Sequence, residues 1–535
     1  AINQIASQGG VYFEVRMDSL DTSRTYFGVV GDTGVNNQNA YANAGGYTFP
    51  IKGMLSNDPR GHFGTNTDGS STDLRTGNTA FSDGEVIGIA ILSDGKFFAH
   101  REGTYLKDAS GNVGNPSTGA NPLATIDLTL GDWFPYLGYN SSFSINFGQD
   151  GSFQGNETSG GNQDGNAIGD FMFAVPTNCF ALCSSNMAEP TIGPNSGENN
   201  QADDHFKTVL YSGSSDDQTI TTGLQPDWIW IKQRNGTGYH HLTDTSRGIT
   251  RELHSNVTDA ETNYGRIASS SSTGFTFEDD ANTYTNESGN TYVAWNWKAN
   301  GGTATASGSE SGNNPAYSVQ ANATAGFSIV TYTGTGSAGT VAHGLGAVPQ
   351  MYIIKRRSNT GNWYVFHKDI GNTHRLRLDE TSAKADEAAA FNDTSPTSSV
   401  FSIGTSVDVN ADANTYVAYV FAEVDGYSKF GNYTANNTTD GTFIYLGFRP
   451  AWVMFKRTAG NAWGIKDSAR SPINPLSNVL GADATTAEYT TGVALDFVSN
   501  GIKHRNDSGY FNNVAGDNFI YMAFAEAPFK YANAR

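Results

Sequence analysis

The sequence contains few cysteines, and this excludes a disulfide scaffold. Only Cys179 and Cys183 occur, in the stretch "CFALC". Their spacing is not the C-x-x-C of a redox pair, and no histidine cluster accompanies them to complete a metal site. We therefore expect two partly buried structural cysteines.

Charge is also scarce, and most of it is negative. Charged residues make up 16% of the 535 residues and the formal net charge is −20. An average soluble domain has a charged fraction of about a quarter. Excess negative charge repels nucleic-acid phosphates and leaves no basic patch for an anionic membrane. We expect no nucleic-acid partner.

Segments that would target or anchor the chain are missing as well. No run of about 18 apolar residues occurs, so no membrane insertion is predicted. The opening residues, "AINQIASQGG", lack the basic start and the apolar centre of a signal peptide. A strand-like stretch, "VYFEVRM", follows almost at once, so the sequence is expected to begin downstream of its gene's start.

No sequence motif of a known catalytic centre is present. G-x-S-x-G, P-loop and H-E-x-x-H patterns do not occur. Glu423 and Glu526, in two "FAE" stretches, come nearest to a catalytic acid, but a repeated structural position explains them better. His240 and His241 are adjacent, so on a strand they point to opposite faces and cannot readily share a metal ion. We predict no catalytic, cofactor-binding or metal-binding residue, and a protein that is not an enzyme.

Two acidic stretches are candidates for calcium, the one cofactor left open. Asp408, Asn410 and Asp412 resemble the start of a calcium loop, but Ala413 replaces its glycine and Tyr419 stands where its glutamate belongs. The other stretch is 278–280, "EDD".

What the chain has in abundance favours β-structure. It contains 62 glycines, and aromatic residues make up 12%. Aromatic residues are common in strands, and glycine and asparagine supply the positive φ angles of tight turns. Helical periodicity is restricted to short stretches, so we predict an all-β, multi-domain protein.

One group of motifs recurs three times. "PDWIWIK", "PQMYIIK" and "PAWVMFK" begin at Pro226, Pro349 and Pro450, and each ends in a lysine, at Lys232, Lys355 and Lys456. A second landmark, "NTYVAWNWK", "NTYVAYVFAE" and "NFIYMAFAEA", recurs with similar spacing. Repeats of about 100 residues indicate three copies of one β-rich module. We assign residues 205–300, 301–425 and 426–535 to these modules and expect each to be a β-sandwich.

Residues 1–153 differ from the repeats. "VYFEVRMD", "DGEVIGIAILSDGKFFAH" and "FSINFG" occur in that order. The series resembles a SPRY domain, a concanavalin-like β-sandwich, so the resemblance implies that fold here. Residues 154–204 are expected to form a connector strap, and the Gly- and Ser-rich stretch at about 300–322 to act as a flexible linker between the first two modules.

Four residues of the repeats are candidate ligand-binding residues. Trp363 and Trp463 follow "TGN" and "AGN" turns, so we expect them near the surface, where indole rings stack on sugars. Asp244 and Arg247, in "DTSRG", could bind a ligand as a carboxylate–guanidinium pair; the alternative is a local turn, because "DSAR" recurs at Asp467. The three repeated lysines are expected to end a buried strand with their ammonium groups in water.

The whole set of motifs resembles a family of tailed-bacteriophage proteins common in marine phages. The stretches that carry this resemblance are "FMFAVP", "GLQPDWIWIK", "DTSRG", "TYVAWNWKANGG" and "YMAFAEAPFKYANAR". The resemblance implies a virion structural protein, on a tail fibre or the capsid exterior, that contributes to host-surface attachment. The implied partners are other virion proteins, a host-surface glycan or protein, and further copies of the same chain.

Two other functions remain open at the level of sequence. One is a capsid-decorating scaffold with no host ligand. The other is a depolymerase that acts on surface polysaccharide, since paired carboxylates for glycoside hydrolysis meet only in the fold.

Overall fold

The structure, a computed structural model, consists almost entirely of β-strands. It describes residues 9–20, 25–31, 52–58, 62–67, 70–73, 81–128, 133–138, 141–183, 186, 192, 200–278, 284–490, 494–506, 511–512 and 514–527. Two compact units make up the chain, Ala1–Ala188 and Glu189–Arg535. The predicted all-β, multi-domain architecture is confirmed. Among the described helices, none has the length and apolar character needed to cross a membrane.

The first unit contains two sheets that share one core. One has the order β11-β1-β6-β7-β8, with β12 beside β1 and β9 beside β7; the other has the order β10-β2-β3-β4-β5. The strands of the first sheet are β1 (Gly10–Ser19), β6 (Val86–Ile91), β7 (Lys96–Arg101), β8 (Thr104–Tyr105), β9 (Ala124–Thr125), β11 (Ser142–Asn146) and β12 (Cys179–Ala181). Those of the second are β2 (Thr25–Gly31), β3 (Lys52–Asp58), β4 (His62–Thr67), β5 (Ser70–Asp73) and β10 (Trp133–Gly138).

Alternate residues of β1 point into this core, as the period of two in a strand requires. Val11, Phe13 and Val15 pack there with Trp133 from the opposite sheet. The β-sandwich expected here is therefore present, while the likeness to a SPRY domain stays a prediction.

Buried Glu14 of β1 holds the segment that follows the sandwich. Its carboxylate accepts hydrogen bonds from the backbone N–H groups of Met172 (3.0 Å) and Phe173 (2.8 Å), and from the side chain of Asn146 (3.0 Å). Burial raises the pKa of Glu14, and these donors partly offset that rise. The strap continues into β12, which pairs in parallel with β1.

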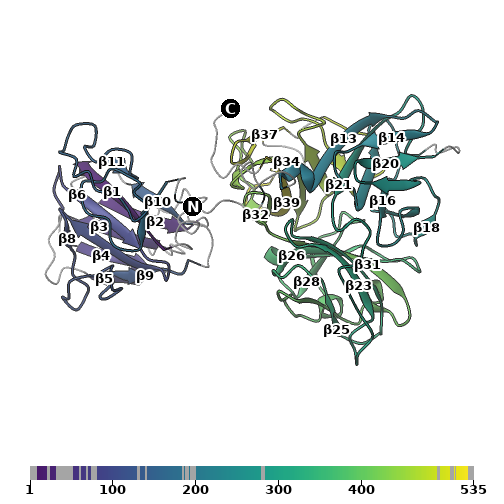
Figure 1. Ribbon diagram of the computed structural model, residues 1–535, viewed down its shortest axis with the longest axis horizontal. Helices are drawn as coiled ribbons and strands as arrows, with labels where there is room; N and C mark the ends of the chain where they lie inside the picture. The colour runs from purple at the N-terminus through teal and green to yellow at the C-terminus, as the bar shows by residue number, and fades with distance from the viewer. Residues whose placement is uncertain are drawn as a thin grey trace. The chain divides into compact units, whose positions relative to one another are not determined.

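The second unit contains three modules built from equivalent strands (Figure 1). A short 3-10 helix, η2 (Ala202–Asp204), precedes the first module. Its large sheet has the order β13-β21-β15-β16-β17-β18, and its small sheet the order β14-β20-β19. The strands are β13 (Phe206–Ser212), β14 (Gln218–Thr221), β15 (Trp228–Gln233), β16 (His240–Asp244), β17 (Arg251–His254), β18 (Thr262–Asn263), β19 (Ser269–Ser271), β20 (Gly274–Phe277) and β21 (Thr291–Trp297).

The second module repeats this order as β24-β31-β26-β27-β28-β29 and adds β23 and β22 at the β24 edge; its small sheet is β25-β30. Its strands are β22 (Ala306–Gly308), β23 (Tyr317–Asn322), β24 (Phe327–Thr333), β25 (Gly339–Ala342), β26 (Pro349–Arg356), β27 (Tyr364–His367), β28 (His374–Arg377), β29 (Ala385–Asp386), β30 (Val400–Ile403) and β31 (Thr415–Ala422). The helical turns are η3 (Lys368–Ile370), α3 (Ala388–Phe391) and α4 (Val407–Asn410). The prediction of a flexible linker at about 300–322 was wrong. In the structure β22 pairs with β23 and β23 pairs with β24, so this stretch forms an edge of the large sheet.

The third module has the large-sheet order β32-β39-β34-β35-β36 and the small-sheet order β33-β38-β37. Its strands are β32 (Ser428–Thr434), β33 (Phe443–Tyr445), β34 (Arg449–Arg457), β35 (Gly464–Asp467), β36 (Leu480–Gly481), β37 (Leu495–Val498), β38 (Gly501–His504) and β39 (Asn518–Ala527). The five strands that all three large sheets share therefore occur in one order in every module.

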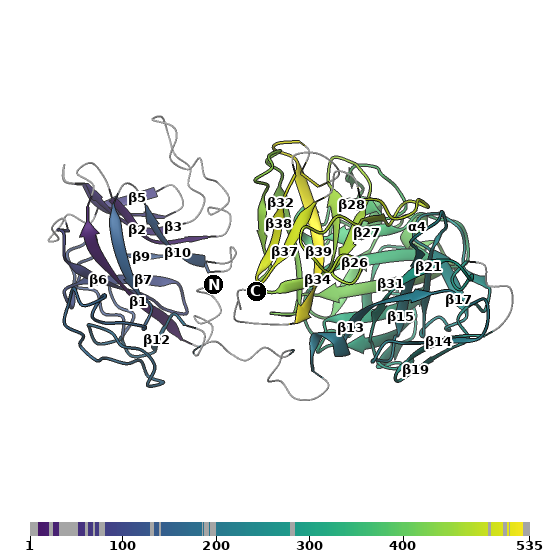
Figure 2. The same cartoon turned by 90° about the horizontal axis from the view of Figure 1, so that it is seen from above.

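The three large sheets lie close to one another (Figures 1 and 2). Aromatic side chains from all three modules form one core between them. Each pair of modules has a direct ring contact there, and the ring centres are 4.2 to 6.1 Å apart. The pairs are Trp228–Tyr419, Trp297–Trp452 and Phe421–Phe524. In the first two modules, the opposite face of the large sheet packs under the module's own small sheet. This is why the first four residues of "WIWIK" are all apolar: both faces of β15 are buried.

The repeated lysines join the modules in a cyclic order. The Nζ of Lys355 donates to the carbonyl of Thr258 in the first module (2.9 Å), and Lys456 donates to Glu380 in the second (2.9 Å). Lys232 closes the cycle by donating to Thr485 in the third (3.3 Å). All three lysines are fully buried, so the expectation of ammonium groups in water was wrong. Carbonyl oxygens from a neighbouring module replace the water.

Truncating the central core should destabilise all three modules together. We expect Trp228→Ala to cost about 3–5 kcal/mol of unfolding free energy, because its ring packs against residues of two modules. Hydrogen-exchange mass spectrometry should show the amides of the three modules losing protection in parallel. Trp133→Ala in the first unit serves as the control and should leave these amides protected. Loss of protection confined to residues 205–300 in Trp228→Ala would contradict a shared core.

Candidate functional site

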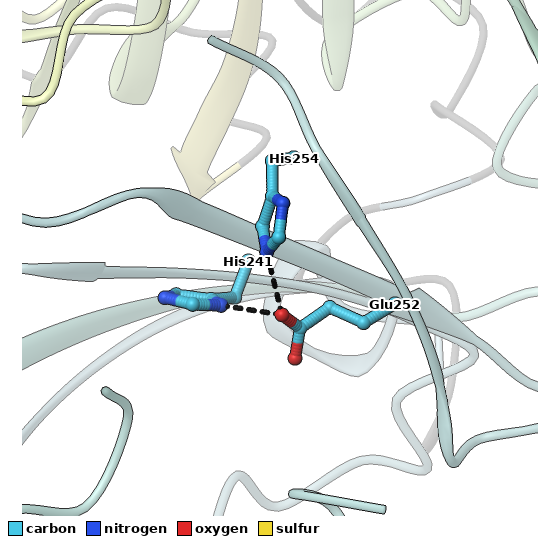
Figure 3. Close-up of side chains that lie close together, drawn as sticks. All are labelled: His241, Glu252 and His254. Atoms are coloured by element: carbon cyan, nitrogen blue, oxygen red, sulfur yellow. Dashed lines mark hydrogen bonds and ion pairs between the residues drawn. The ribbon is translucent and has the colours of Figure 1, made fainter. Parts of the chain in front are cut away.

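Two neighbouring strands of the first module bring two histidines and a glutamate together (Figure 3). His241 on β16 lies directly opposite His254 on β17, and Glu252 lies two residues earlier on the same strand. A spacing of two places Glu252 and His254 on one face of the strand. His241, Glu252 and His254 are exposed by 4%, 5% and 8%.

The three side chains meet at one carboxylate oxygen. Oε1 of Glu252 lies 2.7 Å from Nδ1 of His241 and 2.6 Å from Nε2 of His254. Nη1 of Arg266 also bonds to this oxygen. A single buried oxygen thus has two imidazoles and a guanidinium around it.

The charges in this site are set by burial and by the partners of Glu252. Burial alone would raise the pKa of Glu252, but the hydrogen bonds and charges of His241, His254 and Arg266 outweigh it and lower the pKa well below its usual value. Burial lowers the pKa of His241, although Glu252 opposes this. The site therefore contains an ionised carboxylate beside the guanidinium of Arg266.

Exposed tyrosines surround the cluster. The ring of Tyr239 stacks on His254 with centres 4.9 Å apart. The guanidinium of Arg266 lies 4.1 Å from the ring centre of Tyr264 and 4.5 Å from that of Tyr284. These three tyrosines are 39% to 55% exposed, so the buried cluster lies just below an aromatic surface.

A small cavity adjoins the cluster. Its volume is about 10 Å³, enough for one water molecule or an ion of similar size. His241, Glu252 and Arg266 line it together with Thr243, Thr285 and apolar residues of the sandwich interior.

The corresponding positions of the other modules hold different chemistry. The cross-strand pair His241–His254 corresponds to Tyr364–Arg377 in the second module and Gly464–Gly481 in the third. Glu252 corresponds by position to Arg375 and Val479. In the third module a Cβ at Gly464 would lie 2.1 Å from the ring of Phe511, so an aromatic ring occupies this space. The module fold therefore does not depend on the His–Glu–His set.

Sequence reasoning missed this site. His241 was considered only beside His240, which the structure places on the opposite face, where its ring bonds to Trp230 and Gly481. The signal that could have found the site is "ELH" at 252–254, a glutamate and a histidine at a spacing of two on a strand. It becomes informative only once β16 and β17 are known to pair.

Asp244 and Arg247 form a turn inside a junction between modules. The Asp244 carboxylate accepts the backbone N–H of Arg247 (2.8 Å) and bonds to its guanidinium. It also accepts a hydrogen bond from the hydroxyl of Tyr419 in the second module (2.8 Å). Both side chains are fully buried. The local-turn alternative describes them best, with a role in module docking that the sequence did not indicate.

Trp363 and Trp463 also lie in junctions, and their expected place near the surface was wrong. They are exposed by 0% and 1%. Each indole N–H donates to a backbone carbonyl of the preceding module, Trp363 to His254 and Trp463 to Arg377, both at 2.8 Å. Stacking on a sugar requires an exposed ring face, which neither has.

The remaining candidates have partners within the fold. Glu423 bonds to Lys429, and Glu526 pairs with Arg449. Of the calcium stretches, Asp408 accepts hydrogen bonds from Asn362, and Asp279 and Asp280 lie outside the described residues. Cys179 is buried and Cys183 half-buried, and both are free thiols.

Comparison with known families classifies most of the second unit. Residues 201–528, more than half of the chain, match the family described as Domain of unknown function (DUF7483). The chain belongs to the DUF7483 family. No curated protein matches it in sequence. The DUF7483 region coincides with the three modules, so the three-module arrangement is the domain, and the His–Glu–His cluster lies inside it.

The buried Asp–Arg pairs of the DUF7483 region should be costly to break. Asp244 and Asp467 each pair with a buried arginine three residues on, whereas His367 and Ile370 occupy these positions in the second module. We expect Asp244→Asn and Asp467→Asn each to lower the unfolding free energy by about 1.5–3 kcal/mol, because a buried guanidinium loses one of its two carboxylate partners and keeps the other, Glu261 or Glu488. Urea denaturation measures this loss. Tyr419→Phe, which removes only the hydroxyl donor to Asp244, should cost about 1 kcal/mol; equal losses in all variants would contradict the ion-pair explanation.

The histidine that replaces aspartate in the second module should make the protein acid-sensitive. Nδ1 of His367 accepts the backbone N–H of Asp369, and its Nε2 donates to the carbonyl of Tyr521. Burial lowers the pKa of His367 to about 3, against about 6.5 in an unfolded chain. Between these values the unfolded chain binds more protons, so this contribution to stability is complete above about pH 6.5 and is lost as the pH falls.

We expect His367→Gln to reduce the loss of unfolding free energy between pH 7 and pH 4.5, because a side-chain amide can keep both hydrogen bonds without titrating. Denaturation at the two pH values measures the difference. His374→Gln, at a half-buried position outside the junctions, is the control. An unchanged pH dependence in His367→Gln would show that His367 does not cause it.

Proposed function

We propose that this chain is a structural component of a bacteriophage particle, on a tail fibre or the capsid exterior, that contributes to attachment to the host surface. The observation that carries the structural part of the proposal is the closed cycle of three β-sandwich modules around one core. The resemblance of the motifs to tailed-phage proteins supports the assignment to a virion.

The closed cycle suits a particle exposed to the environment. Each junction combines a buried lysine with a hydrogen bond from a tryptophan or histidine ring to a carbonyl of the neighbouring module. No module can separate without exposing these groups and part of the aromatic core. Such cooperativity limits local opening, which is the usual route of proteolysis.

The same arrangement favours multivalent binding. The three modules present the same strand scaffold with different side chains at equivalent positions. Several weak sites held at fixed distances gain avidity from their linkage. We propose other virion proteins and a host glycan or protein as partners, and self-association of the chain as a further source of valency.

Quantitative mass spectrometry of purified phage particles, calibrated against the major capsid protein, tests this proposal. We expect the chain to be present, with a low copy number for a tail location and a high one for the capsid exterior. Binding of the purified chain to host envelopes should then follow. Absence from the particle contradicts the proposal. Presence without envelope binding favours a decorating scaffold, and new reducing ends after incubation with host polysaccharide would establish a depolymerase.

A further inference from the structure

The His–Glu–His cluster has the composition and spacing of a metal site. One nitrogen of His241, one of His254 and an oxygen of Glu252 all lie within 4.8 Å of one another. The two imidazole rings have centres 5.0 Å apart and planes at 86°. Two imidazoles on one tetrahedral zinc ion, with Zn–N bonds of about 2 Å, have ring centres about 5 Å apart.

We propose that His241, Glu252 and His254 bind one divalent cation of the zinc class, and that Arg266 competes with this cation for Glu252. This site goes beyond the proposed virion role and does not depend on it. Two imidazole nitrogens favour zinc and its transition-metal neighbours, because calcium and magnesium prefer ligand sets made only of oxygen.

The comparison between modules supports a role other than folding. At the three equivalent positions the second module has Tyr364, Arg375 and Arg377, and the third has two glycines and a valine. The second module retains an ion pair at these positions, Arg375 with Glu387 at 2.8 Å, and none of its three equivalent positions holds a histidine. A single arginine is enough to neutralise a glutamate, as Arg375 and Glu387 show in the second module. Neutralisation of Glu252 therefore does not explain why two histidines converge on it.

Arg266 supplies the positive charge that balances Glu252 in this structure. It comes from the segment between β18 and β19, and its guanidinium lies beside two exposed tyrosine rings. Only the guanidinium at the end of this long side chain contacts Glu252. The guanidinium can therefore turn toward the tyrosine rings while the strands stay in place. The cavity lined by Glu252 and Arg266 has room for one ion, and withdrawal of the guanidinium would leave space for a water ligand.

Cation binding would change the spacing of the ligand atoms. Bonds of about 2 Å from zinc put neighbouring ligand atoms about 3.3 Å from one another. The oxygen of Glu252 would therefore move away from the two nitrogens, which lie 2.7 and 2.6 Å from it. Small rotations of the side chains achieve this, because His241 and His254 already project from directly paired positions. Three protein ligands and a water would complete a four-coordinate site with one exchangeable position.

Equilibrium dialysis of the full chain against zinc, with the metal quantified by mass spectrometry, tests the proposal. We expect one zinc ion per chain. Substituting cobalt should give the visible absorption of a tetrahedral site, a signature that a hydrogen-bonded cluster cannot produce. Glu252→Gln, and the double variant His241→Gln/His254→Gln, should lose zinc binding by about 100-fold or more, since they remove ligands.

Arg266→Gln distinguishes a metal site from a purely structural ion pair. If the arginine competes with the cation, this variant binds zinc about 10-fold more tightly, and zinc raises its melting temperature by more than it raises that of the wild type. Glu387→Gln is the matched control, because it breaks the corresponding ion pair of the second module and should leave zinc binding unchanged. Circular dichroism of each variant confirms folding.

Two outcomes overturn the proposal. One is no zinc uptake by the wild-type chain and none by Arg266→Gln, which identifies the cluster as a structural ion pair. The other is uptake that persists unchanged in Glu252→Gln and in the double histidine variant, which places the ion elsewhere.

Discussion

The second unit depends on the aromatic core in which three large sheets meet. Each module has its own small sheet, but the inner face of its large sheet remains apolar and must be covered. Tryptophan, tyrosine and phenylalanine from all three modules cover one another there, with a direct ring contact for every pair of modules. The hydrophobic surface that each module leaves open is therefore the reason that three of them occur together.

The junctions around this core explain how many charged groups can be buried. Lys232, Lys355 and Lys456 each donate to a carbonyl of their own module and to one of a neighbouring module, so the desolvation of the ammonium group is fully offset when that neighbour is in place. The junctions are not identical. Two use a buried Asp–Arg pair, and the third uses His367 and Ile370 at the same positions. Repetition has kept the geometry of the junction while its chemistry has diverged.

The His–Glu–His cluster is also a place where the three modules differ in their side chains. The positions of His241, Glu252 and His254 exist in every module, and the modules fill them with tyrosine and arginine, or with glycine and a neighbouring ring. Exposed tyrosines and Arg266 extend the cluster to the surface of the first module. A rigid triple scaffold thus allows one module to acquire a separate binding chemistry at no cost to the shared core.

The sequence by itself determined the all-β fold class and the presence of three repeated modules. Alternating and continuous apolar runs, such as "WIWIK", have the period of buried strands, and landmarks recurring in one order define three modules. It could not determine which faces of these strands meet. Trp363 and Trp463 follow turn signals and were expected at the surface, but a neighbouring module covers them; the stretch at 300–322 has a linker composition, but it joins a sheet edge. The contacts of the two tryptophans are not encoded locally, because their carbonyl partners are 109 and 86 positions away. The pairing of β16 with β17 likewise decided that His241, Glu252 and His254 share one face. Residue spacing gives the face on which a side chain lies, and only the tertiary structure decides what lies opposite it.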